Sequence, residues 1–292
     1  TLTAPTGFEL SGDGSSFSNS LSLNEVSGSL VNTTVYVRVK SDATGYPTGT
    51  ISLTTTGGIS KGIAVKAAAN AALHFDGDDD YVKVDALAAN LNSDFTISFW
   101  VNVEEYRTED SYVFSVNTIG NDNKFLIGID HDHYQPIFHY KYSGYITKLI
   151  GDENIIDINE WYNFSLSKSG SEYKFYLNGI LLKTLIASIT VSDDDKVSLG
   201  QEFDPGSTIT NELFGKIDEL RIWDKALSQE EIESQMFETL QGNESGLLAY
   251  YNFNDGVPGT DNSGNATLTD IAGSADGTLI NFSRGSGSSS TW

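Results

Sequence analysis

Residues Phe214–Trp223 read FGKIDELRIW, and this stretch decides the fold because it places a carboxylate within an alternating strand pattern. Side chains of a β-strand point alternately to its two faces, so regular alternation predicts Asp218 on the same face as Leu220 and Ile222. A buried carboxylate without a partner is strongly unfavourable. Asp218 therefore needs a cation, a basic side chain or several backbone N–H donors, and a local bulge that returns it to solvent is the alternative.

Two earlier segments carry equally clear strand signals. Residues Phe95–Val101 read FTISFWV, in which apolar and polar residues alternate as in a half-buried strand. Residues 173–185 read YKFYLNGILLKTL, with Asn178 and Gly179 between two apolar runs. Because both central positions of a type I′ turn need positive φ, this dipeptide predicts a β-hairpin.

One helix is predicted, over residues 228–240. Ser228 and Glu231 have the spacing of a capping box, and Gly242 can end the helix. Apolar residues recur every four positions along it, at Ile232, Met236 and Leu240. The other segments favour strands, so the sequence predicts an all-β protein with one short helix.

Composition excludes several classes of partner. The 292 residues contain 17 Lys and Arg against 40 Asp and Glu, a formal net charge of −23 that would repel nucleic acid and anionic lipid surfaces. No apolar run approaches the ~18 residues of a membrane span, so membrane insertion is not expected. Cysteine is absent, which rules out disulfides and thiolate zinc sites. The excess of carboxylates suits divalent cations or neutral ligands, and a solvated acidic surface is the simpler interpretation.

The length predicts two domains, at residues 1–68 and 71–292. The first is rich in Ser, Thr and Gly and has alternating runs at 34–40, 49–55 and 63–67. It resembles the immunoglobulin-like modules of large bacterial surface proteins. Because that family has further strands before the segment Phe8–Ser11, the resemblance implies a small β-sandwich that is incomplete at its N-terminus.

A second acidic concentration is the segment Phe75–Tyr81, FDGDDDY. Its tight turn contains a glycine, and the surrounding carboxylate and carbonyl oxygens could converge on a hard cation. It lacks the ligand spacing of an EF-hand, and most acidic turns are simply solvated. From these residues alone, metal binding and a solvated turn both remain open.

The larger domain resembles the laminin-G-like family of the concanavalin A-like superfamily. The motifs that carry this resemblance occur in the family's order, at Leu73–Val82, Phe95–Val101, Glu160–Tyr162, Tyr176–Gly179 and Gly215–Trp223. The resemblance covers roughly residues 71 to 284, and it implies a jelly-roll β-sandwich of two sheets.

The same resemblance implies calcium. A structural Ca²⁺ in that superfamily commonly joins the first strand region to an aspartate of the last long strand. By position this corresponds to Asp218 together with Asp76 or the carbonyls around Gly77 and Asp78. Oxygen ligands without cysteine favour Ca²⁺ over zinc.

A second calcium site is implied in the loop that follows the predicted helix. Asp255 and Asp261 would supply its oxygens, and a plain Asx-turn loop is the alternative there.

Two further motifs are candidates for binding. Residues 130–133 read Asp-His-Asp-His, which could ligate a transition metal, but a solvated loop or rim is the favoured interpretation. The following stretch is rich in aromatic residues. Tyr140, Tyr142 and Tyr145 are the predicted ligand surface, because a tyrosine ring can stack on a sugar or anchor a protein interface.

The sequence predicts a binding protein rather than an enzyme. Glycoside hydrolysis needs two carboxylates at a fixed separation, and the E-x-D-x-x-E motif typical of hydrolases in this superfamily is absent. We therefore expect a non-catalytic, secreted or cell-surface module that binds a polysaccharide or other glycan. A surface-protein partner, a spacer role, or an ancillary role beside a polysaccharide-degrading enzyme is the alternative. Neighbouring modules of a larger chain are further expected partners.

Overall fold

The computed structural model divides into two units, Thr1–Ala69 and Asn70–Trp292. It describes residues 1–23, 25–26, 29–30, 34–40, 48–55, 60–66, 72–118, 123–142, 145–150, 155–204, 208–257, 260–285 and 292. Among these described residues, no helix is long and apolar enough to cross a membrane.

The smaller unit consists of short antiparallel strands. Its four-stranded sheet has the order β3 (Ser20–Leu21), β1 (Leu2–Thr3), β7 (Thr48–Thr54) and β8 (Ser60–Lys66). Two further pairs are β2 (Phe8–Ser11) with β6 (Tyr36–Val39) and β4 (Glu25–Val26) with β5 (Ser29–Leu30). Leu2, Leu10 and Ile51 form its buried centre. The β-structure confirms the strands expected in this region, and the immunoglobulin-like assignment stays a prediction.

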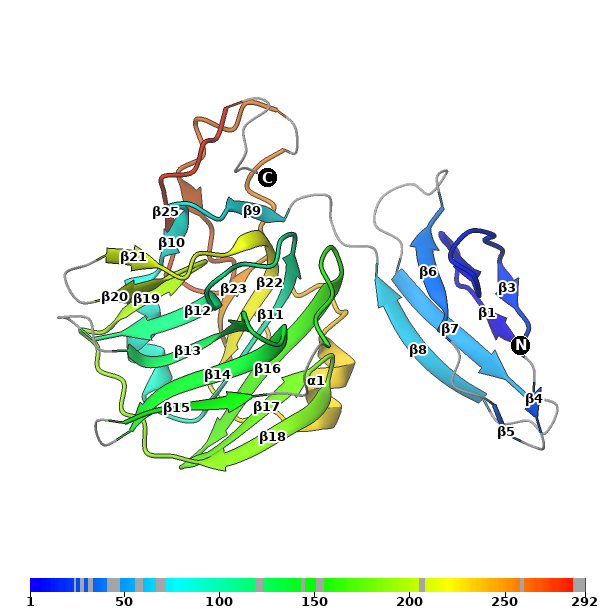
Figure 1. Ribbon diagram of the computed structural model, residues 1–292, viewed down its shortest axis with the longest axis horizontal. Helices are drawn as coiled ribbons and strands as arrows, with labels where there is room; N and C mark the ends of the chain where they lie inside the picture. Colours follow the sequence, from blue (N-terminus) through cyan, green and yellow to red (C-terminus); the bar gives the residue numbers. More distant parts are fainter. Residues whose placement is uncertain are drawn as a thin grey trace. The chain divides into compact units, whose positions relative to one another are not determined.

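The larger unit is a sandwich of two antiparallel sheets (Figure 1). One sheet has eight strands in the order β15 (Tyr145–Ile150), β14 (Gln135–Tyr142), β13 (Asn123–Asp130), β12 (Ser111–Asn117), β19 (Lys196–Leu199), β10 (Tyr81–Lys83), β25 (Gly277–Ile280) and β24 (Thr267–Leu268). The other has seven, in the order β18 (Ile180–Ile186), β17 (Glu172–Leu177), β16 (Trp161–Ser169), β11 (Phe95–Val103), β22 (Phe214–Trp223) and β23 (Leu247–Tyr251), with β9 (Leu73–Asp76) paired to β22. This arrangement confirms the predicted jelly-roll sandwich.

Three shorter elements complete the larger unit. The 3₁₀ helix η1 (Asp85–Leu91) follows β10, the hairpin β20 (Glu202–Asp204) and β21 (Thr208–Thr210) contacts β12, and α1 (Gln229–Gln235) follows β22.

Apolar side chains from the inner faces of both sheets form the core. Phe95, Ile97 and Phe99 of β11 are at most 1% exposed, as their alternation predicts. The Phe95 ring stacks on Phe125 of the opposite sheet, with ring centroids 6.1 Å apart. Burial of such large aromatic surfaces holds the two layers together.

The predicted hairpin is confirmed. Asn178 and Gly179 join β17 to β18 with φ of 50° and 78°, the left-handed values that a type I′ turn requires. The Asn178 Oδ1 also accepts a hydrogen bond from the Asn163 N–H at 2.8 Å. The turn residue therefore ties the hairpin to the neighbouring strand β16.

The predicted capping box is also confirmed, but the helix is shorter than predicted. Ser228 accepts from the Glu231 N–H, and the Glu231 carboxylate accepts from the Ser228 N–H. The α1 helix ends at Gln235 instead of Leu240, because the buried Arg221 guanidinium donates to the Gln235 and Glu238 carbonyl oxygens. These carbonyls are thereby satisfied without further helical turns.

The segment after β23 supplies two strands of the eight-stranded sheet. These are β24 and β25, which pair with each other, and β25 also pairs with β10. Leu268 and Leu279 of these strands belong to the core.

Candidate functional site

Two tyrosine rings stack at one rim of the larger unit. Tyr106 lies between β11 and β12, and Tyr134 lies between β13 and β14. Their ring centroids are 3.8 Å apart with an interplanar angle of 25°. The Tyr106 hydroxyl donates to the Ile156 carbonyl oxygen at 3.3 Å, and the Ile156 N–H donates to the Tyr134 carbonyl oxygen at 3.0 Å. Since Tyr106 is 39% exposed, the pair presents aromatic surface to solvent.

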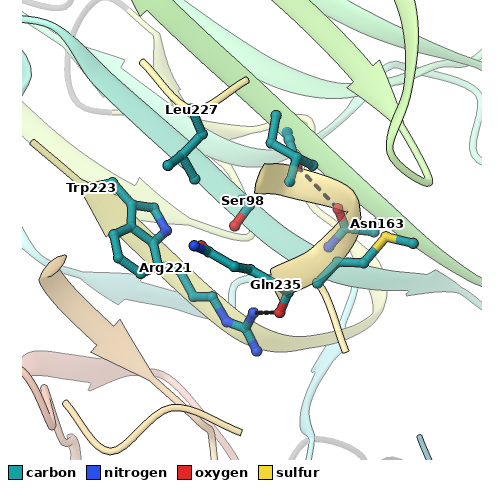
Figure 2. A pocket seen from close by; sticks show the side chains of 9 residues that line it. Ser98, Asn163, Arg221, Trp223, Leu227 and Gln235 are labelled. Carbon is teal, nitrogen blue, oxygen red and sulfur yellow. Dashed lines mark hydrogen bonds between the residues drawn. The ribbon is translucent and has the colours of Figure 1, made fainter. Parts of the chain in front are cut away.

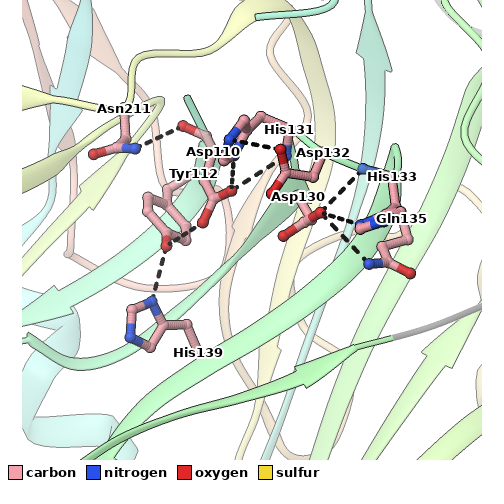
Figure 3. Close-up of polar contacts among 9 residues, drawn as sticks. All are labelled: Asp110, Tyr112, Asp130, His131, Asp132, His133, Gln135, His139 and Asn211. Carbon is pink, nitrogen blue, oxygen red and sulfur yellow. Dashed lines mark hydrogen bonds and ion pairs between the residues drawn. The ribbon is translucent and has the colours of Figure 1, made fainter. Parts of the chain in front are cut away.

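A cluster of carboxylates and imidazoles lies on the same two connections (Figure 3). Asp110 Oδ1 accepts from the His131 N–H at 3.2 Å and lies 2.8 Å from His131 Nδ1. Asp130 Oδ1 accepts from the His133 N–H at 3.1 Å. Asp110 and Asp130 are 6% and 5% exposed, whereas His133 is exposed. The two carboxylates at the bottom of the cluster are therefore buried, whereas its imidazole side is open to solvent.

The buried part of the cluster continues inward to a tyrosine. The Tyr112 hydroxyl lies 3.2 Å from Asp110 Oδ2 and 2.8 Å from His139 Nδ1. Burial and then the charge of Asp110 raise the pKa of Tyr112, so its hydroxyl stays neutral. The hydrogen bond to Asp110 raises the pKa of His131, which favours its charged form beside the carboxylate.

A polar hollow of about 70 Å³ adjoins this cluster. Its lining consists of Arg107, Thr108, Glu109, Asp110, Asn211 and Glu212. Asn211 Nδ2 donates to the Asp110 carbonyl oxygen at 3.0 Å, which fixes one wall. Burial raises the pKa of Glu212, and the charge of Arg107 partly opposes this. The hollow combines donors and acceptors, as a small polar ligand group needs.

Two groups of side chains in the described part of the chain have the proximity needed to hold a metal ion. They are Asp110, Asp130 and His131, and Asp130, Asp132 and His133, with one ligand atom of each residue within 4.8 Å of the others. The structure thus places the buried Asp110, from another loop, beside the Asp-His-Asp-His segment. The interpretation of this segment as a rim is confirmed for Asp132 and His133, which are exposed, but not for the buried Asp130.

The predicted calcium turn is held by an arginine. Arg107 Nη2 donates to the Gly77 carbonyl oxygen at 2.7 Å, so a cationic side chain already contacts this predicted ligand. Gly77 has φ of 74°, and a Cβ there would lie 2.8 Å from the Phe214 Cβ, which explains the glycine. The Asp76 Oδ1 accepts from the Asp78 N–H at 3.2 Å, so the Asp76 carboxylate is bonded within the turn itself.

Asp218 lies away from this turn, so a calcium site shared between them is wrong. Asp76 pairs with Phe214 in the register of β9 and β22, four residues before Asp218. At about 3.3 Å per residue this separates them by about 13 Å along the strand. The residues therefore do not fit one shared ion, and calcium at Asp76, Gly77 or Asp78 stays a prediction.

The predicted face of Asp218 is also wrong, because β22 contains a bulge. Glu219 has φ of 55°, and the register with β11 shifts between Ser98 and Trp100. The extra residue puts Leu220 on the core face, whereas Asp218 pairs with Trp100, whose indole Nε1 donates to the Met236 carbonyl oxygen behind the sheet. Asp218 remains 4% exposed, and its Oδ1 accepts from the Glu219 N–H at 2.8 Å.

The second predicted calcium loop is organised by its own backbone. Asp255 Oδ2 accepts from the Thr269 N–H at 3.0 Å, and Asp261 Oδ1 accepts from the Ser263 N–H at 2.9 Å. The side-chain and backbone hydrogen bonds of Ser263 lower the pKa of Asp261. The contact of Asp261 with Ser263 is that of the Asx-turn alternative, whereas the contact of Asp255 with Thr269 joins two distant parts of the segment, and an ion at either aspartate stays a prediction.

The predicted tyrosine surface is only partly described. Tyr140 packs on the core and stacks on Phe138 with ring centroids 5.6 Å apart, so packing accounts for it rather than an exposed ligand surface. The side chains of Tyr142 and Tyr145 lie outside the described part of the structure. The described exposed aromatic pair at this rim is Tyr106 with Tyr134.

Two other hollows are less suitable as ligand sites. One lies beneath α1 between Ser98, Asn163, Arg221, Trp223, Leu227 and Gln235, and at about 10 Å³ it has room for about one water molecule (Figure 2). The other is a shallow groove of about 510 Å³ between β17, β18 and the start of α1. Its aromatic residue, Tyr176, is 3% exposed and offers little ring surface.

Sequence reasoning missed Tyr106, Arg107 and Asp110. They lie in a connection without periodicity, twenty or more residues before Asp130, and nothing local marks them as neighbours of the Asp-His-Asp-His segment. The strand pairing of β12 with β13 brings the two connections together.

Comparison with solved structures supports the fold. A Bacteroides ovatus protein to which carbohydrate binding is ascribed aligns with a TM-score of 0.55 and 15% identity over 85% of this chain; the match spans 66% of that protein, just under two thirds. The carbohydrate-binding module CBM40 of Ruminococcus gnavus IT-sialidase aligns with a TM-score of 0.49 and 16% identity, over 58% of this chain and 97% of that one. A pentraxin from Limulus polyphemus gives a TM-score of 0.42 and 18% identity, over 56% of this chain and 79% of that one.

Comparison of sequences assigns the family. A search of curated proteins gives no match. The family described as Concanavalin A-like lectin/glucanases superfamily matches residues 76–233, more than half of the chain, and this range contains both connections of the rim. Together with the two-sheet sandwich, this match shows that the chain belongs to the concanavalin A-like lectin/glucanases superfamily.

Proposed function

We propose that the larger unit is a non-catalytic glycan-binding module that contacts its ligand at the rim formed by Tyr106, Tyr134 and the neighbouring polar hollow. The stacked, partly exposed tyrosine pair carries this proposal. A pyranose ring presents apolar C–H faces and hydroxyl edges, so it matches an aromatic surface beside donors and acceptors. Arg107 and Asn211 lie in the adjoining hollow, where they could contact sugar hydroxyls.

The position of the pair is fixed before a ligand arrives. Tyr134 has φ of 45°, which is uncommon for a bulky residue. Hydrogen bonds of both tyrosines to Ile156 hold the two connections together. A preorganised surface loses less conformational entropy on binding than a mobile one.

The carboxylates at this rim favour binding over hydrolysis. A hydrolase needs two carboxyl groups that reach the scissile bond from solvent. Asp110 and Asp130 are nearly buried and accept hydrogen bonds from the backbone of the β13–β14 turn. Their geometry supports a structural role for these two carboxylates, and we propose that the module retains polysaccharide without cleaving it.

The charge of the chain and the fold favour neutral glycans outside the cell. A net charge of −23 opposes sialylated or sulfated ligands. A module that binds polysaccharide acts where polysaccharides occur, at the cell surface or in the medium. The similar fold of the Bacteroides ovatus protein, to which carbohydrate binding is ascribed, agrees with this function.

A screen of neutral and sialylated oligosaccharides tests the proposal. We expect saturable binding of a neutral glycan, no release of reducing sugar, and at least about tenfold weaker binding by the double variant Tyr106→Ala, Tyr134→Ala, since central aromatic contacts contribute more than about 1 kcal/mol. Tyr36→Ala is the matched control, because Tyr36 is 47% exposed and lies in the smaller unit. Parallel titrations with EGTA test the predicted calcium. Unchanged glycan binding by the double variant would exclude the rim, and turnover would exclude a purely binding role.

A further inference from the structure

The two sheets of the smaller unit are joined along one side. Ser18 bridges to Leu10 of β2, while Ser20 and Leu21 of the same segment pair with β1. From this joined side, one sheet continues through β1, β7 and β8, whereas the described part of the other continues only through β2 and β6. The remaining pair, β4 with β5, is hydrogen-bonded to neither sheet. The side opposite the joined one, with β6 and β8 as its free edges, is called the open side below.

The inner face of β6 is incompletely covered along the open side. Val37 pairs with Leu10, which is fully buried, so both side chains point into the sandwich. Val39 pairs with Phe8, which is 3% exposed, and points the same way. Val37 and Val39 are nevertheless each 40% exposed, although they lie on the core side of their strand.

The inner face of β8 shows the same exposure on the other sheet. Ile63 pairs with Ile51, which belongs to the buried centre of the unit and is 4% exposed. Ile63 itself is 61% exposed. Apolar side chains that face the interior from both sheets are thus open to solvent at the same side, as when a sandwich lacks one strand.

The backbone of β6 has hydrogen-bonding groups directed to the open side. The Lys40 N–H donates to the Gly7 carbonyl oxygen at 2.9 Å, so these two residues form a hydrogen-bonded pair. Such pairs alternate along an antiparallel ladder with pairs whose N–H and C=O groups point away from each other. The backbone groups of Val37 and Val39 therefore point away from β2, where a further strand would meet them.

Basic residues on both free edges indicate the charge of such a strand. The Lys and Arg residues of the smaller unit all lie on β6, directly after it, or on β8: Arg38, Lys40, Lys61 and Lys66. These segments contain no Asp or Glu. By alternation, Arg38 and Lys40 lie on the outer face of β6, so outer-face carboxylates of an added strand would lie beside them. The basic edges of a second copy would instead repel these edges.

We propose that the open side of the smaller unit binds one extended segment of another protein, with apolar residues at alternate positions and acidic residues between them. The segment adds a strand to β6 through the backbone groups of Val37 and Val39. Its apolar side chains cover these two valines and Ile63, and its carboxylates lie beside the basic residues of the edge. This interaction is independent of glycan binding, which is proposed for the larger unit.

The test is a titration of the full chain with two labelled, end-capped heptapeptides, one alternating valine with glutamate and the other valine with lysine. Fluorescence anisotropy should show saturable binding of the glutamate peptide and at least about tenfold weaker binding of the lysine peptide. The net charge of −23 by itself favours the lysine peptide, so the opposite preference would identify the basic edges of the open side. No saturable binding of the glutamate peptide, or no preference for it, would overturn the proposal.

Two variants locate the site. Ile63→Asp puts a carboxylate on the inner face of β8, and Val39→Pro removes an N–H that points away from β2, so each should weaken binding at least about tenfold. Ile63→Asp decides alone if Val39→Pro does not fold. The matched control is Ile186→Asp on β18, the edge strand of the larger unit, where the isoleucine is 70% exposed.

The control variant should bind the glutamate peptide like the wild type. Equal weakening by Ile186→Asp, or full binding by Ile63→Asp, would overturn the assignment. Analytical ultracentrifugation of the chain without peptide should show a monomer. A dimer that Ile63→Asp abolishes would assign the open side to a second copy and would also overturn the proposal.

Discussion

At the residue scale, the backbone conformation of Glu219 explains why Asp218 lies on another face of β22 than alternation predicted. A period of two residues placed Asp218 with Leu220, but the left-handed Glu219 inserts one extra residue and moves Asp218 to the opposite face. Alternation assumes a regular strand, and no local signal in IDELRI marks the bulge. The resulting buried charges are balanced by Arg221, which donates to the Glu219 carboxylate and to the carbonyl oxygens of Gln235, the last residue of α1, and Glu238.

Replacing Arg221 with alanine should therefore destabilise the larger unit strongly. Arg221 is 2% exposed and Glu219 is 7% exposed, so the variant leaves a buried carboxylate without its guanidinium. The expected loss is about 3–5 kcal/mol of unfolding free energy, measured by urea denaturation. The double variant Arg221→Met, Glu219→Gln removes both charges and should recover part of this loss. Equal stability of Arg221→Ala and the wild type would contradict the assigned ion pair.

Asn178 gives a second residue-scale prediction, at the β17–β18 turn. Alanine at φ of 50° costs about 1–2 kcal/mol, and Asn178→Ala also removes the hydrogen bond from the Asn163 N–H. Asn178→Gly removes the hydrogen bond but tolerates the backbone conformation, so it should be the milder change. Thermal unfolding of both variants checks whether Asn178→Gly is more stable than Asn178→Ala. A glycine variant that is less stable than the alanine variant would show that the turn conformation is not the decisive contribution.

At the element scale, local patterns predicted β11, the β17–β18 hairpin and the start of α1, because alternation, turn residues and capping depend on neighbours in sequence. The predicted end of α1 was wrong, since Arg221, which lies in β22, determines where the helix ends. The rim was not predictable for the same reason: Tyr106 and Tyr134 meet through strand pairing. The resemblance to the laminin-G-like family correctly predicted the β-sandwich. Two of the calcium ligands that it implies, Asp76 of β9 and Asp218 of β22, do not lie together.

A charged clamp at one end of β22 should make stability depend on pH. Glu104 accepts a hydrogen bond from Lys216 and pairs with His74 at 3.1 Å. Burial alone would raise the pKa of Glu104, but these partners outweigh it and hold the pKa below the usual 4.5. A lowered pKa in the folded state means that the stabilisation is present above pH 4.5 and is lost as the pH falls through the lowered value.

The variant Glu104→Gln should lose about 1 kcal/mol at neutral pH and show a smaller loss of stability on acidification than the wild type. Urea denaturation between neutral and strongly acidic pH measures both effects. Glu172→Gln is the control, because its pair with Lys174 is largely exposed and should contribute less. If the unfolding free energy of Glu104→Gln falls with decreasing pH in the same way as that of the wild type, the clamp is not a source of the pH dependence.

At the scale of the whole molecule, the larger unit combines a sandwich of two sheets with the proposed binding surface on its connections. The core of both sheets fixes β12 and β13, and these strands position the connections that carry Tyr106, Tyr134 and the Asp110 cluster. Such a division lets the loops carry recognition while the sheets carry stability. The acidic surface favours neutral ligands, so glycan binding should depend weakly on salt.

The central claim is that a glycan binds at this rim, and hydrogen–deuterium exchange with and without a saturating oligosaccharide from the screen tests it most directly. We predict protection in residues 104–110 and 131–134 and little change in the smaller unit or in the groove at Ser167–Tyr176. Protection confined to that groove or to the smaller unit, with unchanged exchange at residues 104–110 and 131–134, would contradict the account.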